Sequence, residues 1–121
     1  MELRNQMYQV VSREDKRVTV SLRAEHFIFK AHFPGNPVMP GVCILQMIGE
    51  MMEDIVGVRL ELSKIVNLKF ISPIAPTEGV VIRVDFASIE ESGDEVTGKG
   101  TVLDGEVIKT KFSVVFKKTE R

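Results

Sequence analysis

The segment HFPGNPVMPGVCILQMIGEMMEDIVG, residues 32–57, joins a loop rich in proline and glycine to a long apolar run. The apolar run predicts a helix over residues 41–56, closed by Gly57, because glycine readily adopts the left-handed conformation that ends helices. At 100° per residue, apolar side chains cover a wide face of this helix, so we expect it to be mostly buried. The narrow stripe opposite that face consists of Val42, Gln46, Gly49, Glu50 and Glu53.

Strand patterns lie on both sides of this helix in the sequence. Apolar and β-branched residues predict strands at residues 17–23, 65–72, 80–89, 96–103 and 107–117. The turns Ser92-Gly93-Asp94 and Asp104-Gly105 are hairpin signals, so the later strands should be antiparallel neighbours. One long helix with several antiparallel strands predicts an α+β fold in which the sheet curls around the helix.

The composition limits the classes of function. The chain has 121 residues, of which 44% are hydrophobic, and we expect a single domain over residues 1–121. With 16 basic and 17 acidic residues, it has no positive field to attract nucleic acid or an anionic membrane. No apolar run reaches the roughly 18 residues of a membrane span, and the start lacks a signal-peptide core. The chain is therefore expected to be cytoplasmic, without membrane or nucleic-acid partners.

Other motifs with possible chemistry are weak. Residues 93–100, GDEVTGKG, approach a P-loop, but Gly100 replaces the metal-binding Ser or Thr and the segment has the pattern of a hairpin turn and strand. Cys43 in the first helical turn, with His32 nearby in sequence, suggests a Cys–His nucleophile, although a small apolar residue packed in the core is the favoured interpretation. His26 and His32 have no metal-ligand spacing, so no metal site and no cofactor are expected.

His32 lies beside a rigid loop and a helix start. The loop is fixed by Pro34, Gly35, Pro37, Pro40 and Gly41. At Gly41 the first backbone N–H groups of the helix lack intrahelical partners and point outward with the positive end of the dipole. A base next to a group that polarises a carbonyl is what proton abstraction beside a thioester requires.

These residues closely resemble a known family. HFPGNPVMPGV, residues 32–42, is similar to the signature of the hotdog-fold 3-hydroxyacyl-acyl carrier protein dehydratases, which include hydroxymyristoyl-acyl carrier protein dehydratases. IVNLKFISPIAP, residues 65–76, resembles the strand that follows the helix in that family. The resemblance has motif support over roughly residues 25–86 and implies a curved antiparallel sheet of about five to six strands wrapped around one long central helix.

The resemblance also implies roles for individual residues. His32 would be the catalytic base, the Val38 carbonyl would orient its ring, and the Gly41 N–H would bind the thioester carbonyl. Phe33 and Pro40 are further expected substrate-binding residues. The family architecture implies a dimer, or a higher oligomer, with two sites at the interface, each taking its histidine from one subunit and its acid from the other.

The chain departs from the family pattern in two places. The family's catalytic Glu or Asp falls at the position of Gln46, while Glu50 stands one turn later, where the family often has Gln, so the two residue types look exchanged. A carboxamide can hydrogen-bond a hydroxyl or a water but cannot donate a proton and recover it at neutral pH. Glu50 is then either a replacement acid or a solvated or interface residue. The arginine-rich opening segment of the family is also missing.

Two functions follow from this pattern. The first is a carbon–oxygen lyase that dehydrates a (3R)-3-hydroxyacyl thioester on acyl carrier protein to the trans-2-enoyl thioester, in fatty-acid or polyene-type lipid biosynthesis, with Gln46 or Glu50 assisting the departing hydroxide. The second is a non-catalytic acyl-binding or companion subunit that pairs with an intact paralogue. The first function predicts a homodimer and the second a heterodimer.

Two surfaces remain to be assigned. Because the overall charge gives no steering, we expect the carrier protein to dock on a local basic patch drawn from Lys30, Arg59, Lys64 and Lys69. Four methionines would either line an adaptable acyl tunnel or, as the favoured interpretation, simply fill the core. They are Met39, Met47, Met51 and Met52.

Overall fold

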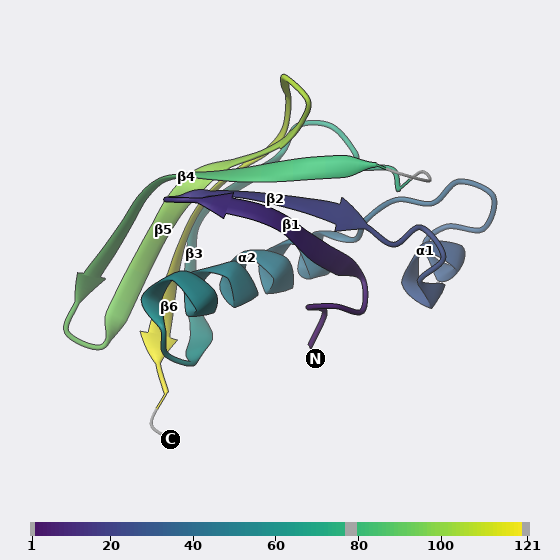
Figure 1. The fold of residues 1–121 in the computed structure, drawn as a ribbon. Helices are drawn as coiled ribbons and strands as arrows, with labels where there is room; N and C mark the ends of the chain where they lie inside the picture. Colours follow the sequence, from purple (N-terminus) through teal and green to yellow (C-terminus); the bar gives the residue numbers. More distant parts are fainter. Residues whose placement is uncertain (1, 77–79, 120–121) are drawn as a thin grey trace.

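The structure is a computed structural model that describes residues 2–76 and 80–119. Its described elements are two helices and six strands, arranged as a sheet curled around one helix (Figure 1). In chain order they are β1 (Tyr8–Glu14), β2 (Arg17–Leu22), α1 (Phe27–Ala31), α2 (Gly41–Val56), β3 (Leu60–Phe70), β4 (Val81–Ser92), β5 (Glu95–Asp104) and β6 (Val107–Lys118).

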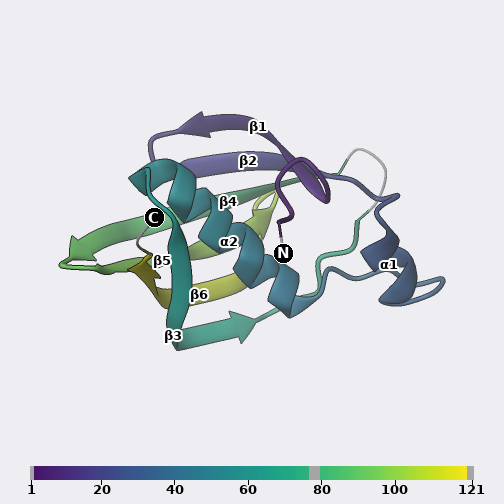
Figure 2. The same cartoon turned by 90° about the horizontal axis from the view of Figure 1, so that it is seen from below.

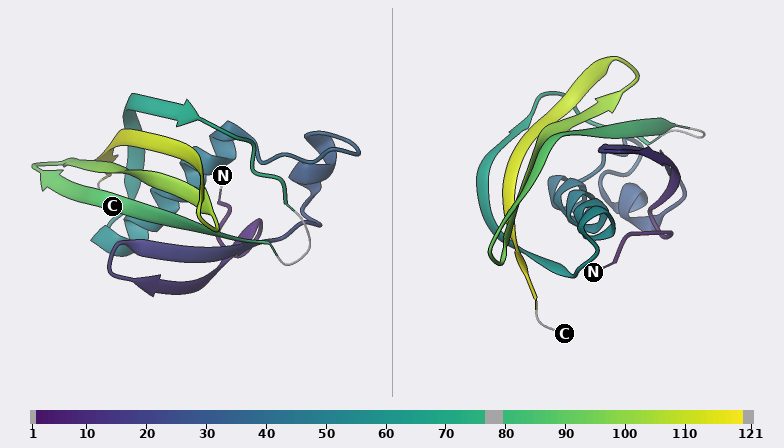
Figure 3. Two further views of the ribbon diagram at one scale, coloured as in Figure 1. Left: turned by 90° about the horizontal axis from the view of Figure 1, so that it is seen from above. Right: turned by 60° about the vertical axis from the view of Figure 1, so that its left-hand side comes forward.

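The strands form one antiparallel sheet in the order β1-β2-β4-β5-β6-β3. Seen along the helix, the sheet wraps around α2 as a half-open cylinder (Figure 3). The sheet has two edges, and the edge strand β3 carries a row of exposed apolar side chains. These are Leu62, Ile65, Val66 and Phe70.

The core lies between α2 and the concave face of the sheet. Alternate residues of the strands point inward, as at Ile82, Val84 and Phe86 of β4, where all three side chains are buried. The four methionines Met39, Met47, Met51 and Met52 are all buried in this core. Gly98 on β5 lies against Met52, because a Cβ there would come within 2.7 Å of its sulfur. The expected α+β hotdog fold with about six strands is confirmed.

Three parts of the fold were not predicted correctly from the sequence. Strand β1 and the short helix α1 were missed, and β3 begins at residue 60 instead of 65. After Tyr8, every residue of β1 is exposed, and β3 is exposed along most of its length, so neither strand shows the two-residue period of a half-buried strand. Helix α1 spans only five residues, too few for a helical period to be visible.

Helix α2 begins and ends as the sequence predicted. Pro40 is its N-cap and Gly57 its C-cap, with a positive φ of 87° and an N–H that donates to Glu53 O over 2.7 Å. The stripe opposite the apolar face is not uniformly exposed, because Gly49 and Glu50 are both buried. The N-terminal residues cross beside the helix in Figure 2. Leu3 N donates to the Glu50 carboxylate, so Glu50 is enclosed and is not the solvated residue that the sequence left as one alternative.

Candidate active site

His32 stands at the C-cap of α1 and is held at three points. Its N–H donates to Ile28 O over 3.0 Å, and its carbonyl accepts from Val38 N over 2.8 Å. Its ring Nδ1 lies 3.2 Å from Val38 O. A carbonyl can only accept, so Nδ1 must carry the hydrogen in this contact. In the neutral ring the lone pair is then on Nε2, which makes Nε2 a base of fixed orientation.

Gly41, at the start of α2, lines the same cavity as His32. Pro40 O accepts from Cys43 N and Ile44 N at the start of α2. Within residues 2–76 and 80–119, no acceptor takes the hydrogen of Gly41 N, as expected for a first helical turn. A Cβ at this position would lie 2.6 Å from the Phe70 ring, so only glycine fits without a shift. A helix N–H without a partner is suited to an anionic or polarised oxygen.

A largely apolar cavity of about 290 Å³ connects these groups. Its walls come from the His32 loop, the start of α2 and the segment after β3. The lining residues are His32, Val38, Met39, Gly41, Ile44, Phe70, Ile71, Ser72, Pro73 and Ile74. Three residues predicted for one site, His32, Val38 and Gly41, therefore line one cavity.

Phe33 and Pro40 stand outside the lining of this cavity. The Phe33 ring stacks on the His32 ring, with centroids 3.9 Å apart and planes inclined by 29°, and the phenyl group is half exposed. Pro40 caps the helix. Both residues support the geometry of neighbouring site groups, and substrate contact for either one stays a prediction.

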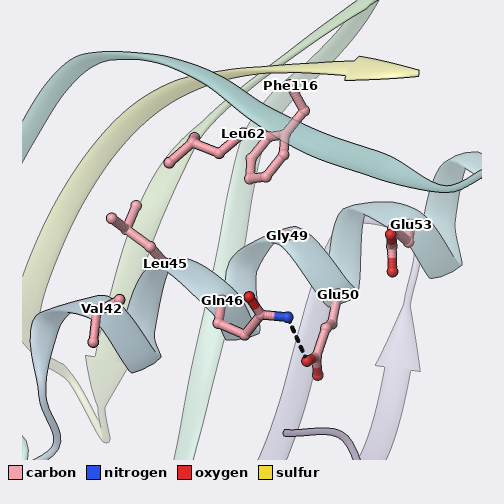
Figure 4. Close-up of a pocket in the computed structure, with 8 residues that line it drawn as sticks. All are labelled: Val42, Leu45, Gln46, Gly49, Glu50, Glu53, Leu62 and Phe116. Atoms are coloured by element: carbon pink, nitrogen blue, oxygen red, sulfur yellow. Dashed lines mark hydrogen bonds between the residues drawn. The ribbon is translucent and has the colours of Figure 1, made fainter. Parts of the chain in front are cut away.

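Gln46 lines a different pocket, of about 150 Å³, on another side of α2 (Figure 4). This pocket is walled by α2 and by strands β3 and β6. Its residues are Val42, Leu45, Gln46, Gly49, Glu50, Glu53, Leu62 and Phe116. The His32 cavity and the Gln46 pocket share no lining residue, so one chain alone does not bring His32 and Gln46 into one cavity.

Glu50 is almost completely buried, with 1% of its surface exposed. Its Oε2 accepts from Leu3 N over 2.7 Å and from Gln46 Nε2 over 2.8 Å. Its Oε1 lies 2.7 Å from the Tyr8 hydroxyl. A buried carboxylate is tolerated when its oxygens have donors, and here both oxygens have them. The carboxylate thus joins α2 to the N-terminal segment.

Arg4 adds a second connection between the N-terminal segment and the helix. Its Nη2 donates to the Glu50 carbonyl over 2.9 Å, and its Nε lies 3.2 Å from Asp54 Oδ2. Sequence reasoning missed this role of residues 3–8. The available signals were Arg4, the one basic residue among residues 2–8, and the acidic residues late in α2, but their contact is long-range and leaves no local pattern.

The remaining sequence candidates can be placed. Cys43 is buried, and burial raises the pKa of its thiol, which disfavours a thiolate and agrees with a core role. Residues 93–100 form the turn and first part of β5, as expected for a hairpin and unlike a P-loop. Among the described residues there is no group of three or more potential metal ligands, and neither described helix is long and apolar enough to cross a membrane.

The four basic residues expected to dock a carrier protein are exposed but are not gathered in one chain. Lys30 lies on α1, Lys64 and Lys69 lie on β3, and Arg59 follows the far end of α2. A helix of 16 residues is about 24 Å long. Figures 1 and 2 place α1 and the end of α2 at opposite ends of the molecule, so Lys30 and Arg59 of one chain cannot form a single patch.

Comparison with known proteins agrees with this geometry. The dehydratase heterocomplex ApeI:P from Xenorhabdus doucetiae has a similar fold, with a TM-score of 0.66 at 17% identity over 92% of this chain and 98% of that chain. An uncharacterized protein from Erwinia carotovora is 27% identical with a TM-score of 0.56, over 93% of this chain and 91% of that one. These similarities, with the sheet curled around one helix, place the chain in the hotdog fold class.

The family assignment is more specific. Residues 8–98 match the ApeI-like family, described as ApeI dehydratase. The 3-hydroxyacyl-[acyl-carrier-protein] dehydratase FabZ of Fusobacterium nucleatum is 35% identical over 105 residues, which cover 83% of this chain and 72% of that protein. FabZ of Chlamydia trachomatis is 30% identical over 114 residues, covering 87% and 72%. The chain belongs to the ApeI-like dehydratase family.

The Tyr8–Glu50 contact predicts how stability depends on alkaline pH. Burial, and then the contact with Glu50, raise the pKa of Tyr8 far above its usual value of 10. Above about pH 10 the unfolded chain loses this proton while the folded chain keeps it, so the free energy of unfolding falls as pH rises. Tyr8→Phe should be less stable at neutral pH, by about 1–3 kcal/mol for the unpaired carboxylate oxygen, and should lose stability less steeply above pH 10.

Urea unfolding at a series of pH values measures this difference. Tyr8 is the single tyrosine and the chain has no tryptophan, so the near-ultraviolet absorbance of tyrosinate reports on this one side chain. As the pH is raised, tyrosinate should form over the same pH range in which the protein unfolds. Its formation near pH 10 in the folded protein would contradict the enclosed contact.

Proposed function

We propose that this chain dehydrates a 3-hydroxyacyl thioester carried on acyl carrier protein to the trans-2-enoyl thioester, in fatty-acid or polyene-type synthesis, at a site shared between two chains. The observation that carries the proposal is the pairing of an oriented His32 Nε2 with the unpartnered Gly41 N–H in one cavity. The FabZ relatives are 3-hydroxyacyl-[acyl-carrier-protein] dehydratases, which supports the substrate class.

In the proposed reaction, His32, Gly41 and Gln46 each have a separate role. His32 Nε2 removes a proton from C2, and the Gly41 N–H stabilises the negative charge that develops on the thioester oxygen. The C3–O bond then breaks, a C2–C3 double bond forms, and the leaving hydroxide becomes water by taking a proton from solvent, while the proton that His32 removed from C2 returns to solvent. Gln46 can hold the hydroxyl but has no proton to donate and recover. A general acid contributes about 10²- to 10⁴-fold to a rate, so turnover should be slow.

We assign Glu50 a supporting role instead of that of the missing acid. All of its nearby donors come from Leu3, Tyr8 and Gln46, and the carboxylate is buried. Proton transfer to a substrate requires contact within hydrogen-bond reach or through one water. Glu50 lines the same pocket as Gln46, but both of its carboxylate oxygens are engaged by these donors, whereas no described residue donates to the Gln46 amide oxygen (Figure 4).

A second candidate function is a companion subunit in a mixed assembly. The specific observation in its favour is the absence of a carboxylic acid at position 46, together with the similarity of the fold to a dehydratase heterocomplex. In a mixed dimer, His32 would face an acid supplied by the partner, and that site would be complete. The two functions differ in whether the chain is active alone.

The dimer that we propose forms through the edge of β3. This strand is long and unpaired on its outer side, and edges of this kind readily join another strand. Antiparallel pairing of two β3 strands would bring Phe70 of one chain, which packs on Gly41, toward Leu60 of the other. That arrangement would bring the His32 cavity of one chain close to the Gln46 pocket of its partner.

We predict that Val66→Asp converts the dimer to a monomer, because two like charges would meet at the middle of the paired edges. Light scattering at micromolar concentration measures the mass. Val107→Asp is a matched control, since Val107 and Val66 are both 56% exposed but Val107 lies on β6. A monomeric wild type, or a dimer that survives Val66→Asp, would contradict the proposed edge.

We predict that His32→Ala abolishes both dehydration and the reverse hydration. His26→Asn is the matched control, since His26 is the N-cap of α1 and asparagine also caps helices. Assays use purified protein with 3-hydroxyacyl or enoyl carrier protein. Wild-type turnover that persists in His32→Ala would rule out His32 as the base.

The exchange of residue types at positions 46 and 50 can be reversed. Gln46→Glu alone would place two carboxyl groups in the contact that now measures 2.8 Å, which costs stability unless they share a proton. The double change Gln46→Glu with Glu50→Gln restores one acid and one amide. We predict at least a tenfold rise in turnover for the double variant. No gain, with a brisk wild-type rate, would mean that another proton source operates.

We also propose that a carrier protein docks beside the His32 cavity, on Lys30 and Lys69 of one chain with Arg59 of the other. The paired β3 edges would bring Arg59, next to Leu60, toward the Phe70 end of the neighbouring strand. We predict that charge reversal at Lys30 and Lys69 weakens carrier-protein binding at least tenfold and removes most of its salt dependence. Charge reversal at Lys117, on β6, is the control. If it weakens carrier-protein binding as much as reversal at Lys30 and Lys69 does, the proposed docking patch is wrong.

A further inference from the structure

The amide of Gln46 is held in one orientation by Glu50. The two residues are one helical turn apart on α2, and Gln46 Nε2 donates to Glu50 Oε2 over 2.8 Å. Figure 4 shows the amide nitrogen turned toward the carboxylate and the amide oxygen turned away from it. No described residue donates to this oxygen, Gln46 Oε1.

The contacts of Glu50 explain why the Gln46 amide is not flipped, with its oxygen and nitrogen exchanged. Leu3 N, which can only donate, lies 2.7 Å from Glu50 Oε2, so this oxygen is an acceptor whatever the state of Glu50 Oε1. A reversed Gln46 amide would set its oxygen against Oε2, and two acceptors would face each other. The N-terminal segment thus fixes the amide through Glu50.

The oxygen that is left free belongs to a pocket whose lining is mainly apolar and also includes Glu50 and Glu53. Val42, Leu45 and Leu62 line the same pocket as Gln46. An oxygen acceptor in such a place strengthens the binding of a ligand that donates a hydrogen bond and weakens the binding of a ligand that offers only lone pairs. A hydroxyl at C3 supplies a hydrogen, whereas a ketone at C3 does not.

We propose that Glu50 is a positioning residue that makes the Gln46 subsite select a 3-hydroxyacyl group over the corresponding 3-oxoacyl group. The inference rests on the proposed function, because it takes the same thioester as ligand. The inference gives this pair of residues a role in substrate selection. Gln46, oriented by Glu50, would accept a hydrogen bond from the substrate hydroxyl without giving it a proton.

The test compares the binding of two probes, the amide analogues of 3-hydroxybutyryl- and 3-oxobutyryl-pantetheine, which lack a cleavable thioester. Calorimetry should give about a tenfold or greater preference of the wild type for the hydroxy analogue. Glu50→Met should bring the two affinities to within about threefold, because it removes the oxygen that holds the amide nitrogen and leaves the Gln46 amide free to offer either end to the ligand.

Two further variants keep the result interpretable. Tyr8→Phe loosens the other side of Glu50 without touching the Gln46 contact, so it should keep the wild-type preference even where it lowers stability. Gln46→Met removes the amide at similar size and should abolish the preference even if Glu50→Met fails to fold. A folded Glu50→Met protein with the wild-type preference, or a wild type without preference, would overturn the inference. Failure of both analogues to bind would instead refute the proposed function itself.

Discussion

The packing of helix α2 into the hollow of the sheet is the constraint on which the rest of the structure depends. The helix buries apolar side chains around most of its circumference, with Met47, Ile48 and Met52 almost fully enclosed. It is therefore fixed in rotation, and the His32 cavity and the Gln46 pocket open onto different parts of its surface. One is the start of the helix at Gly41, and the other is the side that carries Gln46. The separation of these two parts is what makes a shared site the natural arrangement for a pair of chains.

The exchange of acid and amide on α2 is a coupled feature. Glu50 could not be buried at its position without donors, and they come from the backbone of Leu3, the hydroxyl of Tyr8 and the amide of Gln46. The carboxylate therefore joins the N-terminal segment and the Gln46 amide into one hydrogen-bonded unit. In the proposed reaction, this unit would offer the substrate a fixed hydrogen-bond acceptor in place of a proton donor.

The parts of the fold and site that the sequence predicted are those with local patterns. Gly57 and the apolar period of residues 41–56 predicted α2, and the alternation at Ile82, Val84 and Phe86 predicted β4. The resemblance of the His32 loop to a family signature predicted three residues that line one cavity. Strands β1 and the first half of β3 had no period because they are exposed edges. The burial of Glu50 depends on Leu3 and Tyr8, more than 40 residues away in sequence, which no local pattern records.

The central claim is that His32 and Gln46 act together only across two chains, and mixed dimers test it most directly. His32→Ala and Gln46→Ala chains carrying different tags are unfolded together, refolded, and the doubly tagged dimers are isolated. One site in such a dimer has both intact residues and the other has neither. The account predicts that dehydration of 3-hydroxyacyl carrier protein reappears in the mixed dimer, at about half of the wild-type rate, while each parent dimer falls well below it. A mixed dimer no more active than its parents would contradict a site built from two chains.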